Sequence, residues 1–163
     1  ATILIFCNTL YIASSMANNL IIEEKPGFGS KFQDINSKDL KLSDFAGKLL
    51  LINLWATWCE PCKEEMPSLD RLQKQYNKED FHILAISIDR GPKKNSANFF
   101  VDYKISNIDL IFDDKNNIPR EVRAAGLPFS LFINQEGKQI AKLIGPAEWD
   151  SIYFKDFVNS NLN

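Results

Sequence analysis

Apolar and polar positions alternate along this chain in a way that predicts strands and helices in turn. The run Leu49–Leu54 is apolar on both faces except for Asn53, which predicts a strand buried at the centre of a sheet. In the segment that follows, apolar residues recur three, three and four positions apart, at Met66, Leu69, Leu72 and Tyr76. This spacing predicts an amphipathic helix that continues to about Asn77.

The rest of the chain continues this alternation. Further strands are predicted at Phe81–Asp89, Leu110–Phe112, Phe129–Ile133 and Gln139–Ile144. Helices are predicted at Ser96–Lys104, Ile118–Ala125 and Glu148–Asn159. A short hairpin turning at Asn36–Asp39 and one helical turn at Ser43–Phe45 precede the central strand, and Asn134–Gly137 carries a strong signal for an antiparallel hairpin. Strands alternating with helices, closed by a hairpin, predict a mixed α/β sheet.

Two cysteines lie where the central strand passes into the first long helix. The first N–H groups of a helix have no intrahelical partner and its dipole favours negative charge, so this position would stabilise a Cys59 thiolate. Cys62 lies one turn further on the same face, so the two thiols can open and close a disulfide. Pro61 fixes φ between them and suits a helix start.

Composition limits the function further. A chain of 163 residues with 45% hydrophobic residues predicts one globular domain. Its 19 basic and 21 acidic residues give a net charge of −2, and no long run of Lys or Arg indicates nucleic-acid binding. Three cysteines are too few for a disulfide-stapled scaffold.

The N-terminal part of the chain differs from the rest. Residues 1–22 contain no charge and are strongly apolar, which predicts an export signal peptide or a membrane anchor. Cys7 in this segment is interpreted as an inert apolar side chain. Residues 23–31 contain Pro26, Gly27 and Gly29 and are predicted to be a linker, which leaves residues 32–163 as the folded domain.

Several strings of residues resemble a known family. The string Trp58–Cys62 after a buried strand, Pro67, and Gly126–Pro128 before a hairpin strand together look like the thioredoxin fold, over roughly residues 32–159. More narrowly, Asn53–Pro67 and Gly145–Asp150 resemble the TlpA/ResA group of membrane-tethered bacterial reductases.

The resemblance implies an α/β thioredoxin fold in which helices flank a central mixed β-sheet. An N-terminal β-hairpin is expected to precede the central strand. The 38 residues between Asp89 and Pro128 exceed what a bare thioredoxin needs, and the excess resembles the helix-and-strand insertion that this group carries before its cis-proline.

The resemblance also implies roles for individual residues. Cys59 is expected to attack a substrate disulfide as a thiolate, and Cys62 to resolve the mixed disulfide. Asn53 stands where thioredoxins place a buried aspartate, and it cannot exchange a proton. Glu65 matches a glutamate that ResA-like proteins hold near the second cysteine, where burial would raise its pKa and let it relay protons. The alternative is a solvated charge on the helix face, as for Glu64.

The remaining predicted site residues shape the surface around the cysteines. Pro128 is expected to be a cis-proline facing them, with the Leu127 backbone pairing with an extended substrate peptide. Trp58 and Trp55 are interpreted as packing residues of the rim, and Trp58 is counted with the substrate-binding residues. Glu60 adds a negative charge near the thiolate, which favours a potential closer to that of thioredoxin, about −270 mV, than to the about −120 mV of a strong oxidant.

The resulting hypothesis is a thiol–disulfide oxidoreductase, favoured as a reductase, on the periplasmic side of a bacterial inner membrane, either anchored or secreted. Its substrates would be proteins with disulfides, and its family serves cytochrome c or cytochrome oxidase biogenesis. Because that compartment is oxidising, a membrane electron donor is implied for re-reduction. We expect no cofactor, no bound metal and a monomer.

Other functions remain open or are excluded by residue type. A copper(I) carrier using the two thiolates, a disulfide oxidase or isomerase, and a peroxide reductase stay as alternatives. A structural zinc site lacks ligands, because only His82 and Cys7 could join the pair, and His82 is interpreted as a core or edge residue. Haem attachment is excluded because Lys63, not His, follows Cys62. A purely structural disulfide across two residues would gain little chain entropy.

Overall fold

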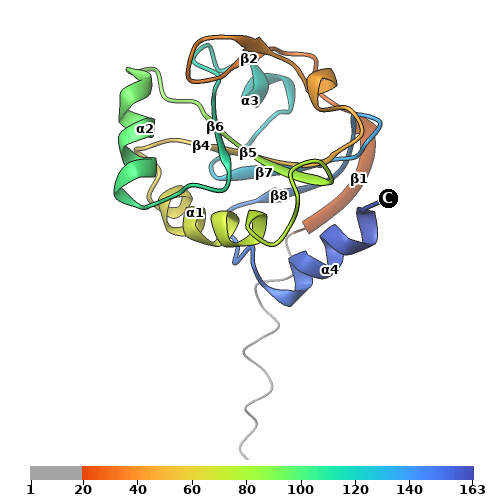
Figure 1. Ribbon diagram of the computed structural model, residues 1–163. Helices are drawn as coiled ribbons and strands as arrows, with labels where there is room; N and C mark the ends of the chain where they lie inside the picture. The colour runs from red at the N-terminus through yellow and green to blue at the C-terminus, as the bar shows by residue number, and fades with distance from the viewer. Residues whose placement is uncertain (1–19) are drawn as a thin grey trace, which may run out of the picture.

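An eight-stranded mixed sheet runs through the computed structural model, which describes residues 20–163 (Figure 1). Its strands are β1 (Leu20–Pro26), β2 (Phe32–Gln33), β3 (Asp39–Leu40), β4 (Leu49–Trp55), β5 (Phe81–Ser87), β6 (Asp109–Phe112), β7 (Phe129–Ile133) and β8 (Lys138–Ile144). Their order is β1-β8-β7-β4-β5-β6-β2-β3. β4 and β5 are parallel, as are β5 and β6, whereas β7 lies antiparallel to both β4 and β8. Because β4 is a central strand, the segment that follows it lies at the end of the sheet where β4 stops, near the middle of that end.

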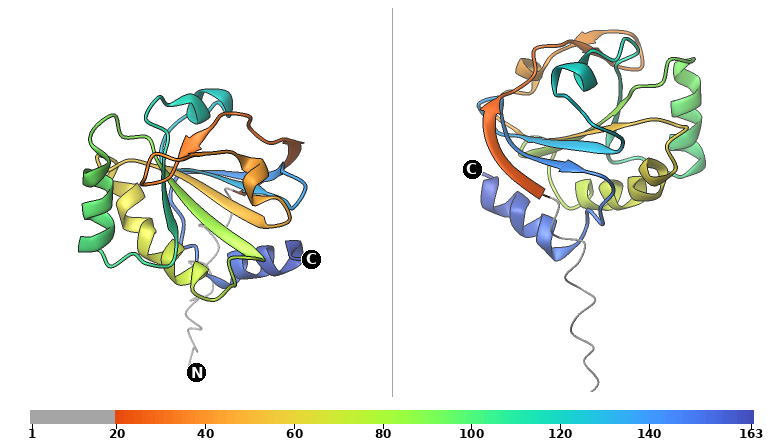
Figure 2. Two further views of the ribbon diagram at one scale, coloured as in Figure 1. Left: turned by 45° about the horizontal axis from the view of Figure 1, so that its top comes forward. Right: turned by 180° about the vertical axis from the view of Figure 1, so that it is seen from behind.

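Helices cover both faces of the sheet. They are η1 (Leu42–Phe45, a 3₁₀ turn), α1 (Glu60–Gln73), α2 (Lys93–Asp102), α3 (Asn117–Glu121) and α4 (Ile152–Asn161). α1, α2 and α4 pack against one apolar cluster, while η1, α3 and the β2–β3 hairpin pack against a second cluster on the opposite face (Figures 1 and 2). The two clusters sandwich the sheet.

β4 contributes side chains to both clusters. All seven of its residues are buried. Leu49 and Leu51 belong to the cluster under α1, and Leu50 and Ile52 to the cluster on the other face, as alternation along a strand requires. The prediction of a strand buried on both faces is therefore confirmed.

Most other predicted elements are present, with shifted ends. The N-terminal β-hairpin is β2–β3, and α2, β6 and α3 form the inserted segment between β5 and β7. α1 ends at Gln73 rather than Asn77, because the N–H groups of Gln75 and Tyr76 donate to carbonyls three residues back, at 3.1 and 3.0 Å, instead of four. α4 begins at Ile152, four residues later than predicted, because residues 145–150 form a loop over α1.

The prediction that residues 23–31 are a linker is wrong. Leu20–Pro26 forms β1, an edge strand antiparallel to β8, seen beside it from behind in Figure 2. Glu23 pairs with Lys142 of β8 at 3.1 Å, and the Phe28 side chain is buried in the core. The folded unit therefore begins by Leu20 and not near Phe32.

The predicted export segment, residues 1–22, lies outside the described residues except for Leu20–Ile22, and Cys7 lies outside them too. Between Leu20 and Asn163, no helix has the length and apolar character that crossing a membrane requires.

Gly27 directly follows β1, and the packing around it leaves no room for a side chain. A Cβ at Gly27 would run into the backbone carbonyl of Gly137, in the turn between β7 and β8, and would meet Leu42 Cδ1 at 2.9 Å. We expect Gly27→Ala to lower the free energy of unfolding by about 1–3 kcal/mol, the usual range for overpacking. Urea denaturation measures it, with Gly29→Ala as the control, since a Cβ there meets only Glu121 Oε1 at an ordinary 3.6 Å. Equal stabilities of the two variants would contradict the steric argument.

Candidate active site: a disulfide at the start of helix α1

Cys59 and Cys62 form a disulfide at the N-terminus of α1, with their Cα atoms 5.3 Å apart. Cys59 is the N-cap residue, with extended backbone angles (φ −96°, ψ 102°), and its carbonyl accepts the Lys63 N–H at 3.2 Å. Pro61 lies in the first turn, where its missing N–H removes no helical hydrogen bond. Cys59 is 7% exposed and Cys62 is fully buried, so a partner thiol or disulfide reaches Cys59 first.

Glu65 lies one turn beyond Cys62 and points into the protein. Its side chain is 4% exposed, unlike that of its exposed neighbour Glu64, so the interpretation as a solvated helix-face charge is excluded. Burial raises the pKa of Glu65 to about 7, although three hydrogen bonds to its carboxylate oppose the rise. A carboxyl with such a pKa can take up or release a proton near neutral pH.

Asn53 on β4 contacts this carboxyl directly. Its Nδ2 donates to Glu65 Oε1 at 2.7 Å and to the Ser130 hydroxyl of β7 at 3.0 Å. Within residues 20–163 its Oδ1 is buried and has no hydrogen-bond partner. If the amide turned over, Oδ1 would face Glu65 and could accept a hydrogen bond from the protonated carboxyl. Asn53 can therefore pair with either protonation state of Glu65.

The loop of residues 145–150 supplies the other two donors to Glu65. The Ala147 N–H and the Trp149 indole N–H reach Glu65 Oε2 at 2.9 and 2.8 Å. Ser68 Oγ accepts the Trp149 N–H at 3.1 Å, and Arg71 pairs with Asp150 at 2.6 Å. Glu65, Ser68 and Arg71 recur three positions apart, so one face of α1 holds the loop.

The sequence pattern does not predict this role of Trp149, because it puts Trp149 inside the last helix. Trp149 precedes α4 and is fully buried. The resemblance of Gly145–Asp150 to the TlpA/ResA group was the one signal that pointed to this loop.

The cis-proline loop lies beside the end of β4, the strand that leads to the cysteines. The Leu127–Pro128 peptide bond is cis, as predicted. The next residue, Phe129, pairs with Leu54 at the end of β4, so Pro128 lies beside the segment that leads to Cys59. Of the predicted site residues, β4, α1 and this loop thus bring together Cys59, Cys62, Glu65, Asn53, Pro61, Leu127 and Pro128 at one edge of the sheet.

The two tryptophans near the cysteines differ from the prediction. Trp55 ends β4 and is fully buried, with its ring 5.2 Å from that of Phe99 on α2, so it belongs to the core and not to the rim. Trp58 is 71% exposed, so it does not pack as predicted and instead offers its indole to solvent beside Cys59. Alternation at the end of a strand puts one ring inward, and the turn that follows puts the other outward.

Comparison with known proteins places this site in a family. Residues 23–142 match the AhpC/TSA family. The chain belongs to the AhpC/TSA family. It is 30% identical over 152 residues to the thiol-disulfide oxidoreductase ResA of Bacillus subtilis (strain 168), covering 93% of this chain and 82% of that protein. It is 31% identical over 123 residues to ResA of Bacillus cereus, covering 76% and 69% respectively. Within the family it is therefore a ResA-type thiol–disulfide oxidoreductase.

Solved structures support the fold. A putative thiol:disulfide interchange protein DsbE from Chlorobium tepidum superposes with a TM-score of 0.75 at 22% identity, covering 88% of this chain and 100% of that one. A putative thiol-disulfide oxidoreductase from Bacteroides vulgatus has a TM-score of 0.72 at 25% identity, covering 84% and 94%. The predicted thioredoxin-like α/β architecture, with a central mixed sheet flanked by helices, is confirmed.

The charge of Glu60 is partly offset in this ResA-type site. Glu60 is exposed, and its carboxylate lies 2.7 Å from Lys63 Nζ, one turn along α1. This hydrogen bond raises the pKa of Lys63 and keeps its ammonium charged. The sequence argument that Glu60 opposes a Cys59 thiolate is therefore weaker than Glu60 alone suggests, because a cation lies beside it.

Asp89, which follows β5, holds the turn that precedes Cys59, and no motif in the sequence pointed to it. Its carboxylate accepts the Thr57 N–H at 3.0 Å and the Thr57 hydroxyl at 3.1 Å. It also accepts the hydroxyls of Ser87 and Ser96, at 3.1 and 3.0 Å. The carboxylate therefore ties the active-site turn to β5 and α2.

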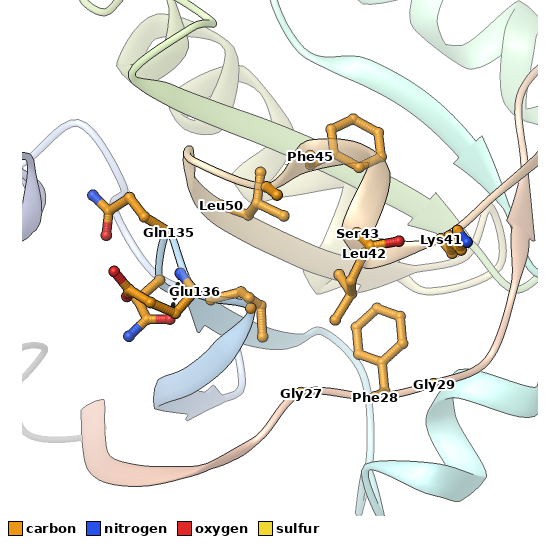
Figure 3. A pocket seen from close by; sticks show the side chains of 14 residues that line it. Gly27, Phe28, Gly29, Lys41, Leu42, Ser43, Phe45, Leu50, Gln135 and Glu136 are labelled. Atoms are coloured by element: carbon orange, nitrogen blue, oxygen red, sulfur yellow. Dashed lines mark hydrogen bonds between the residues drawn. The ribbon is translucent and has the colours of Figure 1, made fainter.

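A separate hollow of about 440 Å³ lies at the other end of the sheet (Figure 3). It is lined by Leu50, at the start of β4, and Ile133, at the end of β7, whereas Cys59 follows the last residue of β4. Figure 3 shows Phe28 and Leu42 from the N-terminal region on one side of it. The hollow is not part of the redox site.

His82, on the interior strand β5, is buried, which agrees with the core reading of the two interpretations drawn from the sequence. Its Nε2 lies 2.8 Å from Asp109 Oδ2, at the edge of β6. In the described part of the chain, no group of three or more His, Cys, Asp or Glu side chains is arranged to hold a metal ion.

Proposed function

We propose that this ResA-type oxidoreductase works as a reductase of disulfides in exported proteins. The observation that carries the proposal is the buried Glu65 carboxyl one turn from Cys62. A negative charge at Glu65 disfavours a nearby thiolate. Strong disulfide oxidants owe their potential to a stabilised reduced form, so a site that disfavours thiolates has a more reducing potential.

The geometry supports a reaction in two steps. The Cys59 thiolate attacks one sulfur of the substrate disulfide, which forms a mixed disulfide and releases the first substrate sulfur as a thiolate that takes a proton from water. Cys62 then passes its proton to the Glu65 carboxylate, and its sulfur attacks the Cys59 sulfur of the mixed disulfide, which releases the second substrate sulfur as a thiolate that takes a proton from water. Glu65 returns its proton to water. The substrate gains two electrons and the Cys59–Cys62 pair loses two. Re-reduction then needs a dithiol donor, which we propose to be a membrane protein.

The surrounding residues have proposed roles in this cycle. Trp58 offers an exposed indole and the cis Leu127–Pro128 loop an extended backbone, so we assign both to substrate binding. Pro61 and Glu60 are assigned to tuning the potential, and Asn53 to pairing with Glu65.

Export and clients are the finer part of the proposal. The uncharged residues 1–22 support delivery across, or tethering to, a bacterial inner membrane with the domain on its periplasmic side. Resemblance to the TlpA/ResA group supports apocytochrome c or cytochrome oxidase proteins as clients. Fractionation of cells that express the full chain tests the location.

The direction of electron flow is tested by the midpoint potential. We expect equilibration with glutathione buffers at pH 7 to give a value more reducing than about −230 mV, near the about −270 mV of thioredoxin. The fraction oxidised can be read by thiol alkylation and mass spectrometry. A value more oxidising than about −200 mV would show that the protein acts as an oxidase or isomerase instead.

A further inference from the structure

A recess of about 540 Å³ opens beside the exposed Trp58. Thr57 and Trp58 of the active-site turn line one part of it, and Asp89, Arg90 and Asn95 line another. No residue of the cis-proline loop is among the residues that line it. The recess therefore extends the surface around the disulfide beyond the loop to which substrate binding is assigned.

Two charged residues, Asp89 and Arg90, line this recess, and they differ in whether their side chains already have hydrogen-bond partners. Both oxygens of Asp89 already accept hydrogen bonds from Thr57, and one also accepts those of Ser87 and Ser96. Arg90 is exposed, and within residues 20–163 its guanidinium forms no ion pair or hydrogen bond. Asp89 keeps its negative charge, but its oxygens are already occupied by hydrogen bonds. Of the two charged residues that line the recess, Arg90 is thus the one whose hydrogen-bonding groups are free for a ligand.

The start of α2 adds a second feature that favours a negative group. α2 begins at Lys93, its N-terminus has no side-chain cap, and its first turn contains no acidic residue. Asn95 of this turn lines the recess. The Asn95 N–H already donates to the Pro92 carbonyl at 3.0 Å, so it is the helix dipole that favours an anion here, and Arg90 lies three residues before that start.

We propose that the recess receives an acidic side chain of the substrate polypeptide, next to its reacting cysteine, with Arg90 as the cation that binds it. This inference rests on the proposed function, because it concerns the same disulfide exchange at Cys59. An arginine can hold a carboxylate through two parallel hydrogen bonds, which orients as well as attracts it. Trp58, shared by the recess and the active-site turn, links the two parts of the surface.

The test uses two synthetic peptides, each with one internal disulfide. They are identical except for the two residues beside the first cysteine, which are both Asp in one peptide (the Asp peptide) and both Lys in the other (the Lys peptide). The prereduced protein is mixed with each peptide, and peptide thiols are followed by chromatography. We expect the Asp peptide to be reduced roughly threefold to tenfold faster than the Lys peptide, mostly through a lower KM. The effect is of this size because the contact is a partly exposed charge pair. Arg90→Glu should reverse this preference and speed the Lys peptide.

Lys94→Glu is the matched control, because it makes the same change of net charge four residues away and outside the recess. It should keep the preference for the Asp peptide. Equal rates of the wild-type protein on both peptides, or equal shifts in the two variants, would overturn the role of Arg90 while leaving the reductase function intact. If the wild-type protein reduced neither peptide, the proposed function and this inference would fail together.

Discussion

Replacing Cys59 by Ser is expected to abolish disulfide exchange, with a loss of roughly 10³-fold or more, as when other enzymes lose their nucleophile. Cys59 is the partly exposed member of the pair, whereas Cys62 is fully buried, so no second sulfur can make the first attack from the same place. A serine hydroxyl is almost never ionised at neutral pH and forms no disulfide. Reduction of a disulfide-bonded peptide by the prereduced protein measures the effect.

The Cys62→Ser variant distinguishes the role of Cys62 from that of Cys59. Cys59 can still attack in this variant, but nothing resolves the mixed disulfide, so a covalent complex with the substrate should accumulate on non-reducing gels. Cys7→Ser serves as the control for thiol content and should behave as the wild type. If Cys59→Ser trapped the complex and Cys62→Ser did not, the roles of the two cysteines would be reversed.

The centre of the fold was predictable because its signals are local. The run Leu49–Leu54 is apolar throughout except for Asn53, and the helical spacing begins soon after Cys62, so the redox pair could be placed at a strand-to-helix junction. β1 was not predictable in this way. Leu20–Pro26 is an edge strand of half-buried and exposed residues, and its partner β8 lies more than a hundred residues away in the sequence. Its main-chain pairing leaves no periodic apolar pattern.

The site was predictable in its sulfur chemistry but not in its burial. Whether Glu65 is solvated depends on the loop that contributes Ala147 and Trp149, which comes about eighty residues later in the chain. The motif also could not separate Trp55 from Trp58, which are three residues apart and belong to the core and the surface respectively. Long-range packing decides both, and a local pattern contains no information about it.

Glu65→Gln is expected to change the pH dependence of stability. The pKa of Glu65 is about 7 in the folded protein, above the 4.5 of an ordinary glutamate. As pH rises from about 4.5 to about 7, the unfolded chain releases this proton while the folded chain keeps it, so the folded state loses stability. Over this interval of about 2.5 pH units the loss is roughly 3 kcal/mol, and it is complete above pH 7.

A glutamine does not titrate, and the site can accommodate it. Its carbonyl can accept from Ala147 and Trp149, and its amide can donate to Asn53 Oδ1 once that amide has turned over, which gives the buried Oδ1 a partner. Urea unfolding of the disulfide form should therefore show similar stabilities at pH 4, and a variant more stable by up to roughly 3 kcal/mol at pH 8. Turnover near pH 7 should fall by roughly 10²-fold, as expected for a lost general acid–base.

Glu64→Gln is the matched control, because Glu64 is the exposed neighbour of Glu65 on the same helix. This variant should have a stability profile and a turnover close to those of the wild type. A more stable protein that turns over more slowly would show that burial of Glu65 is maintained for the reaction at a cost in stability. Parallel pH profiles of stability for the wild type and Glu65→Gln would instead mean that Glu65 titrates like a solvated carboxyl. In that case the proton transfer assigned to it would have to come from water.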